Sequence, residues 1–346
     1  QFYEEAISLC RQKRFHEVLE KCRYTSLDDE EEYSIDVIQP EKIEFKQNSY
    51  EDGENSIISF PEFLLLVLDV CTGGEQPASH YQPDKLIEKF DALKTYFTAG
   101  EFYEKMLYYR LLLDYYTIRR DIKDGQGNYS LILKGPKDDS DKLKQYQSML
   151  YVSTEAFYNW LKPYLRKLEQ DELHSCAEML AFLKKEDNER HSILPARKDL
   201  SYKASGNIRY WFWRLDYYLW EQRSTFFNEE EQKIVEHYVF RRNRSIEHLH
   251  PQDESHNEEW EEEAVHSFGN LAMISQSFNS QQSNDHIQIK FARIHEQISN
   301  KSLQSIKMFL MCKLADFNYL NWTMKLTKEH ENEMIEFLER SFYISD

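Results

Sequence analysis

Glycine and proline are scarce in this 346-residue sequence, which has nine of the first and eight of the second. Their scarcity argues against a turn-rich all-β protein and leaves little material for glycine loops that bind phosphate. The five cysteines are scattered and form no Cys-x-x-Cys pair, so we expect neither a disulfide framework nor a thiolate zinc site. We therefore expect a cytoplasmic protein whose cysteines are reduced.

Long hydrophobic runs are missing as well. The longest, at residues 63–68, is broken by Asp69, whereas a membrane span needs roughly 20 apolar residues. The sequence starts at Gln1, and no charged-then-apolar signal sequence follows it. We therefore expect no membrane association, and a chain that is trimmed or is a fragment.

Positive charge is in deficit, with 43 Lys and Arg against 61 Asp and Glu, a net charge of −18. Residues 206–346 hold 15 basic and 23 acidic residues, a net charge of −8. The part before them holds 28 basic and 38 acidic residues, a net charge of −10. Nucleic-acid binders usually neutralise phosphates with clustered Lys and Arg. Attraction to nucleic acid by bulk charge is therefore excluded, and a local basic patch with a divalent metal remains open.

Helical periodicity dominates the chain, so the expected fold class is mainly α. The length suggests about two domains, and we place a helical connecting region at residues 1–205 and a second domain at residues 206–346. Residues 59–62, Ser-Phe-Pro-Glu, form a capping box with proline in the first turn of a helix that runs to about Cys71. Further helices are predicted at residues 101–120, 157–168, 208–219, 303–317 and 334–342.

Short β-branched and aromatic segments interrupt the helical pattern between residues 237 and 249. They predict either a pair of short strands or one extended segment. Arg241, Arg242 and Arg244 lie between them and either contact phosphate or pair with the acidic run at residues 258–263. The sequence favours neither alternative.

A constellation of polar residues follows. Its members, in chain order, are Glu247, His248, Pro251, Gly269, Asn270, Asn279, Asn284 and Lys290. Hydrolysis of a phosphodiester needs a base that takes a proton from water and a cation that neutralises the developing charge. Histidine titrates near neutrality, so His248 is a candidate base. Mg²⁺ needs only one or two protein ligands, because waters and the phosphate complete its shell.

This motif resembles the HNH-type (His-Me finger) nuclease domain at the C-terminus of GmrSD-like restriction endonucleases, and residues 59–65, 109–115 and 211–217 resemble the helical region before it. The resemblance implies a small ββα-metal unit embedded in further helices. It also implies a metal-dependent endonuclease of phage defence, in which His248 is the general base. Glu247 and Asn279 would bind the divalent metal, for which Mg²⁺ is the first expectation and Mn²⁺ or Ni²⁺ are the alternatives.

The resemblance assigns roles to the remaining motif residues too. Asn270, after Gly269, would pin the loop and orient His248 by hydrogen bonds, and Lys290 would meet a phosphate. Pro251 and Asn284 match further positions of the pattern. The other histidines of the loop (His250, His256 and His266) are expected to be solvated rather than to bind the metal.

The Asp-Gly-Gln-Gln-Arg signature of the family's N-terminal, nucleotide-hydrolysing domain does not occur in the sequence. We therefore expect that DNA, including modified phage DNA, is recognised with the help of that domain or of a partner chain. The net charge of −18 keeps one alternative open, a helical interaction or regulatory module with an inactive HNH-like unit. A second alternative is a nuclease directed at RNA.

Overall fold

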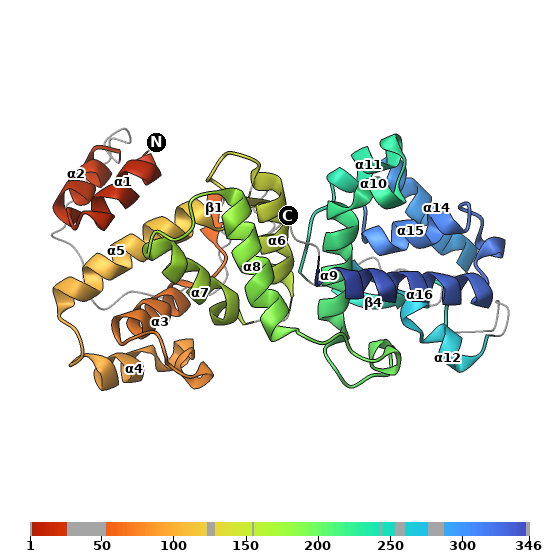
Figure 1. Ribbon diagram of the computed structural model, residues 1–346, viewed down its shortest axis with the longest axis horizontal. Coiled ribbons are helices and arrows are strands. Elements are labelled where there is room, and N and C mark those ends of the chain that lie inside the picture. Colours follow the sequence, from red (N-terminus) through yellow and green to blue (C-terminus); the bar gives the residue numbers. More distant parts are fainter. Residues whose placement is uncertain are drawn as a thin grey trace, which may run out of the picture. The chain divides into compact units, whose positions relative to one another are not determined.

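The computed structural model describes residues 2–25, 53–122, 129–153, 156–242, 244–252, 260–275 and 287–343. This part of the protein is mainly helical, as predicted (Figure 1). Contacts divide the chain into two compact units, Gln1–Ser140 with Phe157–Ser175, and Asp141–Ala156 with Cys176–Asp346. The proposed domains, residues 1–205 and 206–346, stay a prediction. None of the described helices has the length and apolarity that a membrane span requires.

The first unit is organised around one long helix, α5 (Ala99–Tyr116), which contacts α1 (Phe2–Arg11), α3 (Phe60–Cys71) and α7 (Phe157–Glu169). Helix α2 (Phe15–Thr25) packs on α1, and α4 (Leu86–Leu93) packs on α3. Short 3-10 turns lie at Ala78–His80 and Pro83–Lys85. An antiparallel sheet has the order β1 (Gly53–Ser56), β2 (Arg119–Ile122), β3 (Tyr129–Ile132).

The capping-box prediction for α3 is confirmed. The Ser59 side chain accepts from the Glu62 backbone N–H, and the Glu62 carboxylate accepts from the Ser59 backbone N–H. The predicted helix over residues 101–120 extends too far, because α5 ends at Tyr116 and residues 119–122 pair with two neighbouring strands. Asp69, which breaks the apolar run of α3, is buried and accepts from Lys162 Nζ at 2.9 Å.

The second unit is built around α9 (Ile208–Glu221), in which every residue from Tyr210 to Trp220 is buried. Helices α15 (Ile306–Leu314) and α16 (Met324–Arg340) contact α9, and α16 crosses it (Figure 1). The other helices of this unit are α6 (Ser140–Val152), α8 (Cys176–Arg190), α10 (Arg223–Phe226), α11 (Glu229–Glu236), α12 (Glu262–Val265) and α14 (Ile287–Ser299). Its 3-10 turns are η4 (Arg197–Leu200), η5 (Phe268–Asn270) and η6 (Tyr319–Asn321).

A buried ion pair joins three of these helices. The Arg214 guanidinium of α9 has no exposed surface and lies 3.3 Å from the Asp187 carboxylate of α8. The hydroxyl of Tyr146 in α6 donates to the same carboxylate at 2.7 Å, and that of Tyr210 does so at 2.8 Å. Buried charges are costly unless they are paired and hydrogen-bonded, so this network fixes α6, α8 and α9 in one arrangement.

Two strands complete the second unit. β4 (Arg244–His248) pairs antiparallel with β5 (Leu271–Ser275), and His248 lies opposite Leu271. The sequence interpretation was therefore incomplete, because residues 237–240 form no strand and the true partner lies more than twenty residues downstream. Tyr238 and Phe240 are instead buried.

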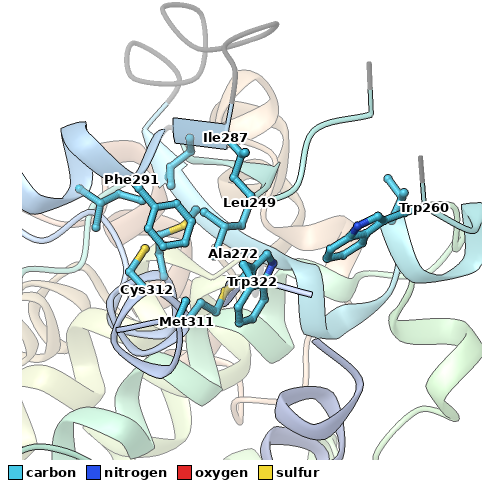
Figure 2. Packing of buried hydrophobic residues seen from close by; sticks show 13 residues of the cluster. Leu249, Trp260, Ala272, Ile287, Phe291, Met311, Cys312 and Trp322 are labelled. Carbon is cyan, nitrogen blue, oxygen red and sulfur yellow. The ribbon is translucent and has the colours of Figure 1, made fainter. Parts of the chain in front are cut away.

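Helix α14 packs against this strand pair. Figure 2 shows Leu249, which follows β4, and Ala272 of β5 gathered with Ile287 and Phe291 of α14. Met311 and Cys312 of α15 continue the same cluster, together with Trp260 and Trp322. In the chain, α12 and η5 lie between β4 and β5, and α14 follows β5, so that the predicted ββα-metal unit stays a prediction. The packing of α14 brings it to the residues at the end of β4.

Candidate functional site

Glu247 and His248 are the last two residues of β4 and are both buried, with 7% and 3% of their surface exposed. Successive side chains of a strand point to opposite faces. Glu247 accordingly contacts Lys290 of α14, whereas His248 contacts Tyr202 and His266. The strand therefore presents a carboxylate on one side and an imidazole on the other.

Lys290 is buried beneath Glu247. Its ammonium donates to the Glu247 carboxylate and, at 2.7 Å, to the backbone carbonyl of His248. Burial raises the pKa of Glu247, and the lysine opposes that rise. Lys290 has 2% of its surface exposed, and its predicted contact with a phosphate stays a prediction. Its position is that of a counter-ion for Glu247.

The imidazole of His248 has a defined neighbour at each nitrogen. Nε2 lies 3.1 Å from His266 Nδ1, and Nδ1 lies 3.1 Å from the amide nitrogen of Gln252. Burial, followed by the nearby His266 and Lys290, lowers the pKa of His248 to about 3. The ring is therefore neutral at physiological pH, and a pKa this low makes it a weaker proton acceptor than a histidine with its ordinary pKa.

Asn270 is fully buried and ties the loop after β4 together. Its Oδ1 accepts from the His250 backbone N–H at 2.8 Å and from Trp322 Nε1 at 3.2 Å. Its Nδ2 donates to the carbonyls of His250 and Val265, both at 2.9 Å. These contacts hold the loop that follows His248, and each of them joins Asn270 to a residue other than His248, so the orientation of His248 by Asn270 stays a prediction.

Gly269 lies where α16 approaches the loop most closely. A Cβ atom at this position would lie 2.3 Å from the Thr327 carbonyl oxygen and 2.9 Å from Glu331 Cβ. A side chain is thus excluded by backbone as well as by side-chain atoms. This contact explains why glycine precedes Asn270.

Two histidines expected to be solvated are buried instead, so that part of the prediction is wrong. His250 stacks on Trp260 with the ring centroids 3.9 Å apart and the planes 2° from parallel. His266 is 8% exposed and lies against His248 and Tyr202. The signal that was overlooked is Trp260, an aromatic residue within the acidic run. His256 lies outside the described residues.

The other predicted residues are distributed as follows. Pro251 is buried beside the site. Arg241 and Arg242 are exposed, and the Arg242 guanidinium lies 4.0 Å from the centroid of the Tyr151 ring and donates to the Tyr151 carbonyl. Arg244 opens β4, but its side chain lies outside the described part, as do the whole of Asn279 and Asn284.

The described residues contain no group of three or more His, Cys, Asp or Glu that could hold a metal ion. They do not fit a structural zinc site, which takes four nitrogen or sulfur ligands. Glu247, however, provides a hard oxygen ligand on the side of β4 opposite the His248 imidazole. One such ligand fits a cation such as Mg²⁺, which keeps several of its waters.

This geometry lies within a recognisable domain. Residues 184–337 match the family model of GmrSD restriction endonucleases, C-terminal domain. The resemblance predicted from the motif is thereby confirmed for this part of the chain. The GmrSD match begins within α8, ends within α16 and includes every predicted site residue. No curated protein and no solved structure matches the chain.

Proposed function

We propose that the GmrSD-type region is a metal-dependent DNA endonuclease in which His248 takes a proton from the attacking water. The observation that supports it best is an imidazole held at the end of β4 by contacts at both ring nitrogens, with Glu247 next to it in sequence. The family match supports nuclease activity and a DNA substrate, since the family is one of restriction endonucleases. A positioned base of this kind contributes about 10²- to 10⁴-fold to a rate.

The residues around His248 have separate tasks in this proposal. Glu247 and Asn279 would hold a divalent cation, which would supply positive charge to neutralise the charge developing on the phosphate. Lys290 balances the buried carboxylate and, through the His248 carbonyl, fixes the backbone of the base. Asn270 holds the loop that follows. Arg241, which is exposed, contributes to binding phosphate.

The wider role proposed is restriction of phage DNA, including modified DNA, in the cytoplasm. The five free cysteines support a reducing compartment. A net charge of −18 disfavours DNA binding by the chain as a whole. We therefore propose that a nucleotide-hydrolysing domain or a partner chain supplies most of the affinity for DNA.

The test is nicking of a supercoiled plasmid in Mg²⁺, Mn²⁺ or Ni²⁺. We expect cleavage that is abolished by EDTA and by His248→Ala, and retained by His237→Ala, which changes an exposed histidine of the same unit. Cleavage that survives both EDTA and His248→Ala would overturn the proposal. Matched RNA and DNA substrates in the same assay identify the nucleic acid.

A second candidate is an interaction module whose HNH-like unit does not cut. The observation in its favour is that the Lys290 ammonium already pairs with the buried Glu247 carboxylate. This function predicts a folded protein that cleaves neither DNA nor RNA with any of the three metals. Cleavage by the wild type that is lost in His248→Ala decides against it.

A further inference from the structure

The His248 ring has one inward and one outward nitrogen. Nε2 points to His266, which is 8% exposed, and Nδ1 points to the exposed side chain of Gln252. The two nitrogens of a neutral imidazole differ, because one carries the proton and the other the lone pair. The hydrogen-bond partners of the two ring nitrogens therefore decide which nitrogen can accept a proton from water.

We propose that His266 is a positioning residue, which accepts a hydrogen bond from His248 Nε2–H and so leaves the lone pair on Nδ1, facing outward. The inference rests on the proposed nuclease function and names the nitrogen that acts as base. The Gln252 amide nitrogen can only donate, and at 3.1 Å from Nδ1 it requires a lone pair there. The proton of His248 is then on Nε2, and His266 Nδ1 accepts it at 3.1 Å.

His266 is held firmly enough for this role. Its backbone carbonyl accepts from the Tyr202 N–H and from the Ser201 hydroxyl, both at 3.0 Å. Its ring stacks on Tyr202 at 15° from parallel, and the same tyrosine meets the His248 ring edge-on. Burial lowers the pKa of His266, which keeps it neutral and able to accept. Tyr202 thus braces both imidazoles.

Gln252 marks the place of the attacking water. Its amide N–H reaches Nδ1 from the loop surface, and a water that replaces it would direct an O–H to the same lone pair. The water proton then passes to Nδ1 as the O–H bond breaks. The water oxygen forms a bond to phosphorus, the bond to the leaving oxygen breaks, and solvent protonates that oxygen.

The experiment measures the tautomer of His248 by ¹⁵N NMR of its ring nitrogens in the full chain. The signals are identified by their loss in His248→Gln. We expect a protonated Nε2 and an unprotonated Nδ1 in the wild type. His266→Asn, whose amide oxygen can accept in place of Nδ1, should keep this tautomer. His266→Leu, made together with Gln252→Ala so that the amide no longer holds the lone pair on Nδ1, should give signals averaged between the two tautomers, whereas Gln252→Ala alone should keep the wild-type tautomer. His237→Leu, at an exposed site, should change nothing.

Cleavage kinetics provide the second readout. We expect His266→Leu to lower kcat at least about 10-fold with little change in KM, and His266→Asn to restore most of it. A wild-type His248 protonated on Nδ1, or a tautomer unaffected by His266→Leu made together with Gln252→Ala, overturns the inference. A wild type with the expected tautomer but no cleavage supports the positioning by His266 and contradicts the proposed nuclease function, so the two failures are distinct.

Discussion

Gly269 and Asn270 lie side by side in the turn before β5 and are constrained in different ways. Gly269 is confined by backbone, since its missing side chain makes room for Thr327. Asn270 is confined by its hydrogen bonds. Its side-chain oxygen accepts from the His250 backbone N–H, and its side-chain nitrogen donates to the carbonyls of His250 and Val265. The site therefore depends on the close packing of Gly269 against α16 and on the hydrogen bonds of Asn270. Each of these can be tested by a single substitution.

Replacement of Gly269 by alanine should destabilise the protein. The new Cβ would lie 2.3 Å from the Thr327 carbonyl oxygen, so α16 or the turn must move. We expect the free energy of unfolding to fall by about 1–3 kcal/mol, as for other overpacked interiors, measured by urea denaturation. Gly206→Ala is the matched control, because a Cβ there meets nothing within 4 Å. Equal effects at the two glycines would contradict this explanation.

Replacement of Asn270 by aspartate tests the hydrogen bonds. The substitution turns the Nδ2 donor into an oxygen that faces the carbonyls of His250 and Val265. We expect a loss of at least about 1–3 kcal/mol in unfolding free energy, the cost of buried polar groups left without partners. Asn300→Asp, at an exposed position, should change it by less than about 0.5 kcal/mol. Thermal unfolding followed by circular dichroism compares the two.

At the scale of elements, β4 is joined to α14 through the ion pair of Glu247 with Lys290. Lys290→Met removes the cation and leaves the carboxylate buried, so the pKa of Glu247, already raised by burial, should rise further. A carboxyl with a raised folded pKa stabilises the fold below its unfolded pKa, and this stabilisation is lost as pH rises through the folded value. The variant should therefore be destabilised more at about pH 8 than at about pH 5.

The measurement is urea unfolding in EDTA, so that no cation replaces the ammonium. Loss of one partner of a buried pair typically costs about 3–5 kcal/mol. The double variant Glu247→Gln with Lys290→Met removes both charges, and its stability difference from the wild type should lose the pH dependence. A single variant with the same deficit at both pH values would show that packing, rather than charge, dominates here.

The start of α3 provides an independent test in the first unit. Ser59→Ala removes the hydroxyl that accepts from the Glu62 backbone N–H. Loss of such a cap costs about 1 kcal/mol, which the midpoint of urea unfolding can report. Ser59→Thr keeps an accepting hydroxyl and should retain most of the stability. If threonine and alanine are equally destabilising, the cap does not stabilise the helix.

Elements with strong local signals were predictable from the sequence. The capping box located α3, and the all-round apolar pattern of α9 indicated its burial. The strand pair was predicted only in part, because the pairing of β4 with β5 is non-local and spans a loop of over twenty residues. The first half of α16 was missed, since its polar residues gave no apolar stripe.

The site shows the same division. The motif named Glu247, His248 and Asn270, which the fold brings together around the end of β4. It gave no indication of Tyr202, Gln252 or His266 as neighbours of the base, because aromatic and amide side chains in loops carry no periodic signal. The ion pair of Lys290 with Glu247 was missed for another reason, since a lysine alone does not reveal whether it is buried.

At the scale of the whole molecule, the family match and the compact unit have different limits. The match covers residues 184–337, whereas the second unit also contains Asp141–Ala156 and the last residues of the chain. Tyr146 binds Asp187 from α6, and Ser341 accepts from Arg214 Nε at 2.9 Å. A fragment bounded by the match therefore loses part of its buried polar network.

We expect residues 184–337, produced alone, to unfold with a lower urea midpoint and a broader transition than the full chain. The reason is that Arg214 loses the Ser341 hydroxyl and Asp187 loses the Tyr146 hydroxyl, two partners of this buried ion pair in the full chain. Residues 176–346 mixed with a peptide of residues 137–156 should recover part of the stability, and a peptide with Tyr146→Phe should recover less. A fragment as stable as the full chain would show that α6 is dispensable.

The placement of α6 also bears on how the protein is made. During synthesis α6 leaves the ribosome before α7, although its buried partners Asp187 and Tyr217 are translated later. Domains generally fold as units while the chain emerges. The buried side chain of Tyr146 in α6 therefore lacks these two partners until α8 and α9 have been synthesised. That interval is the time at which the nascent chain most needs protection from aggregation.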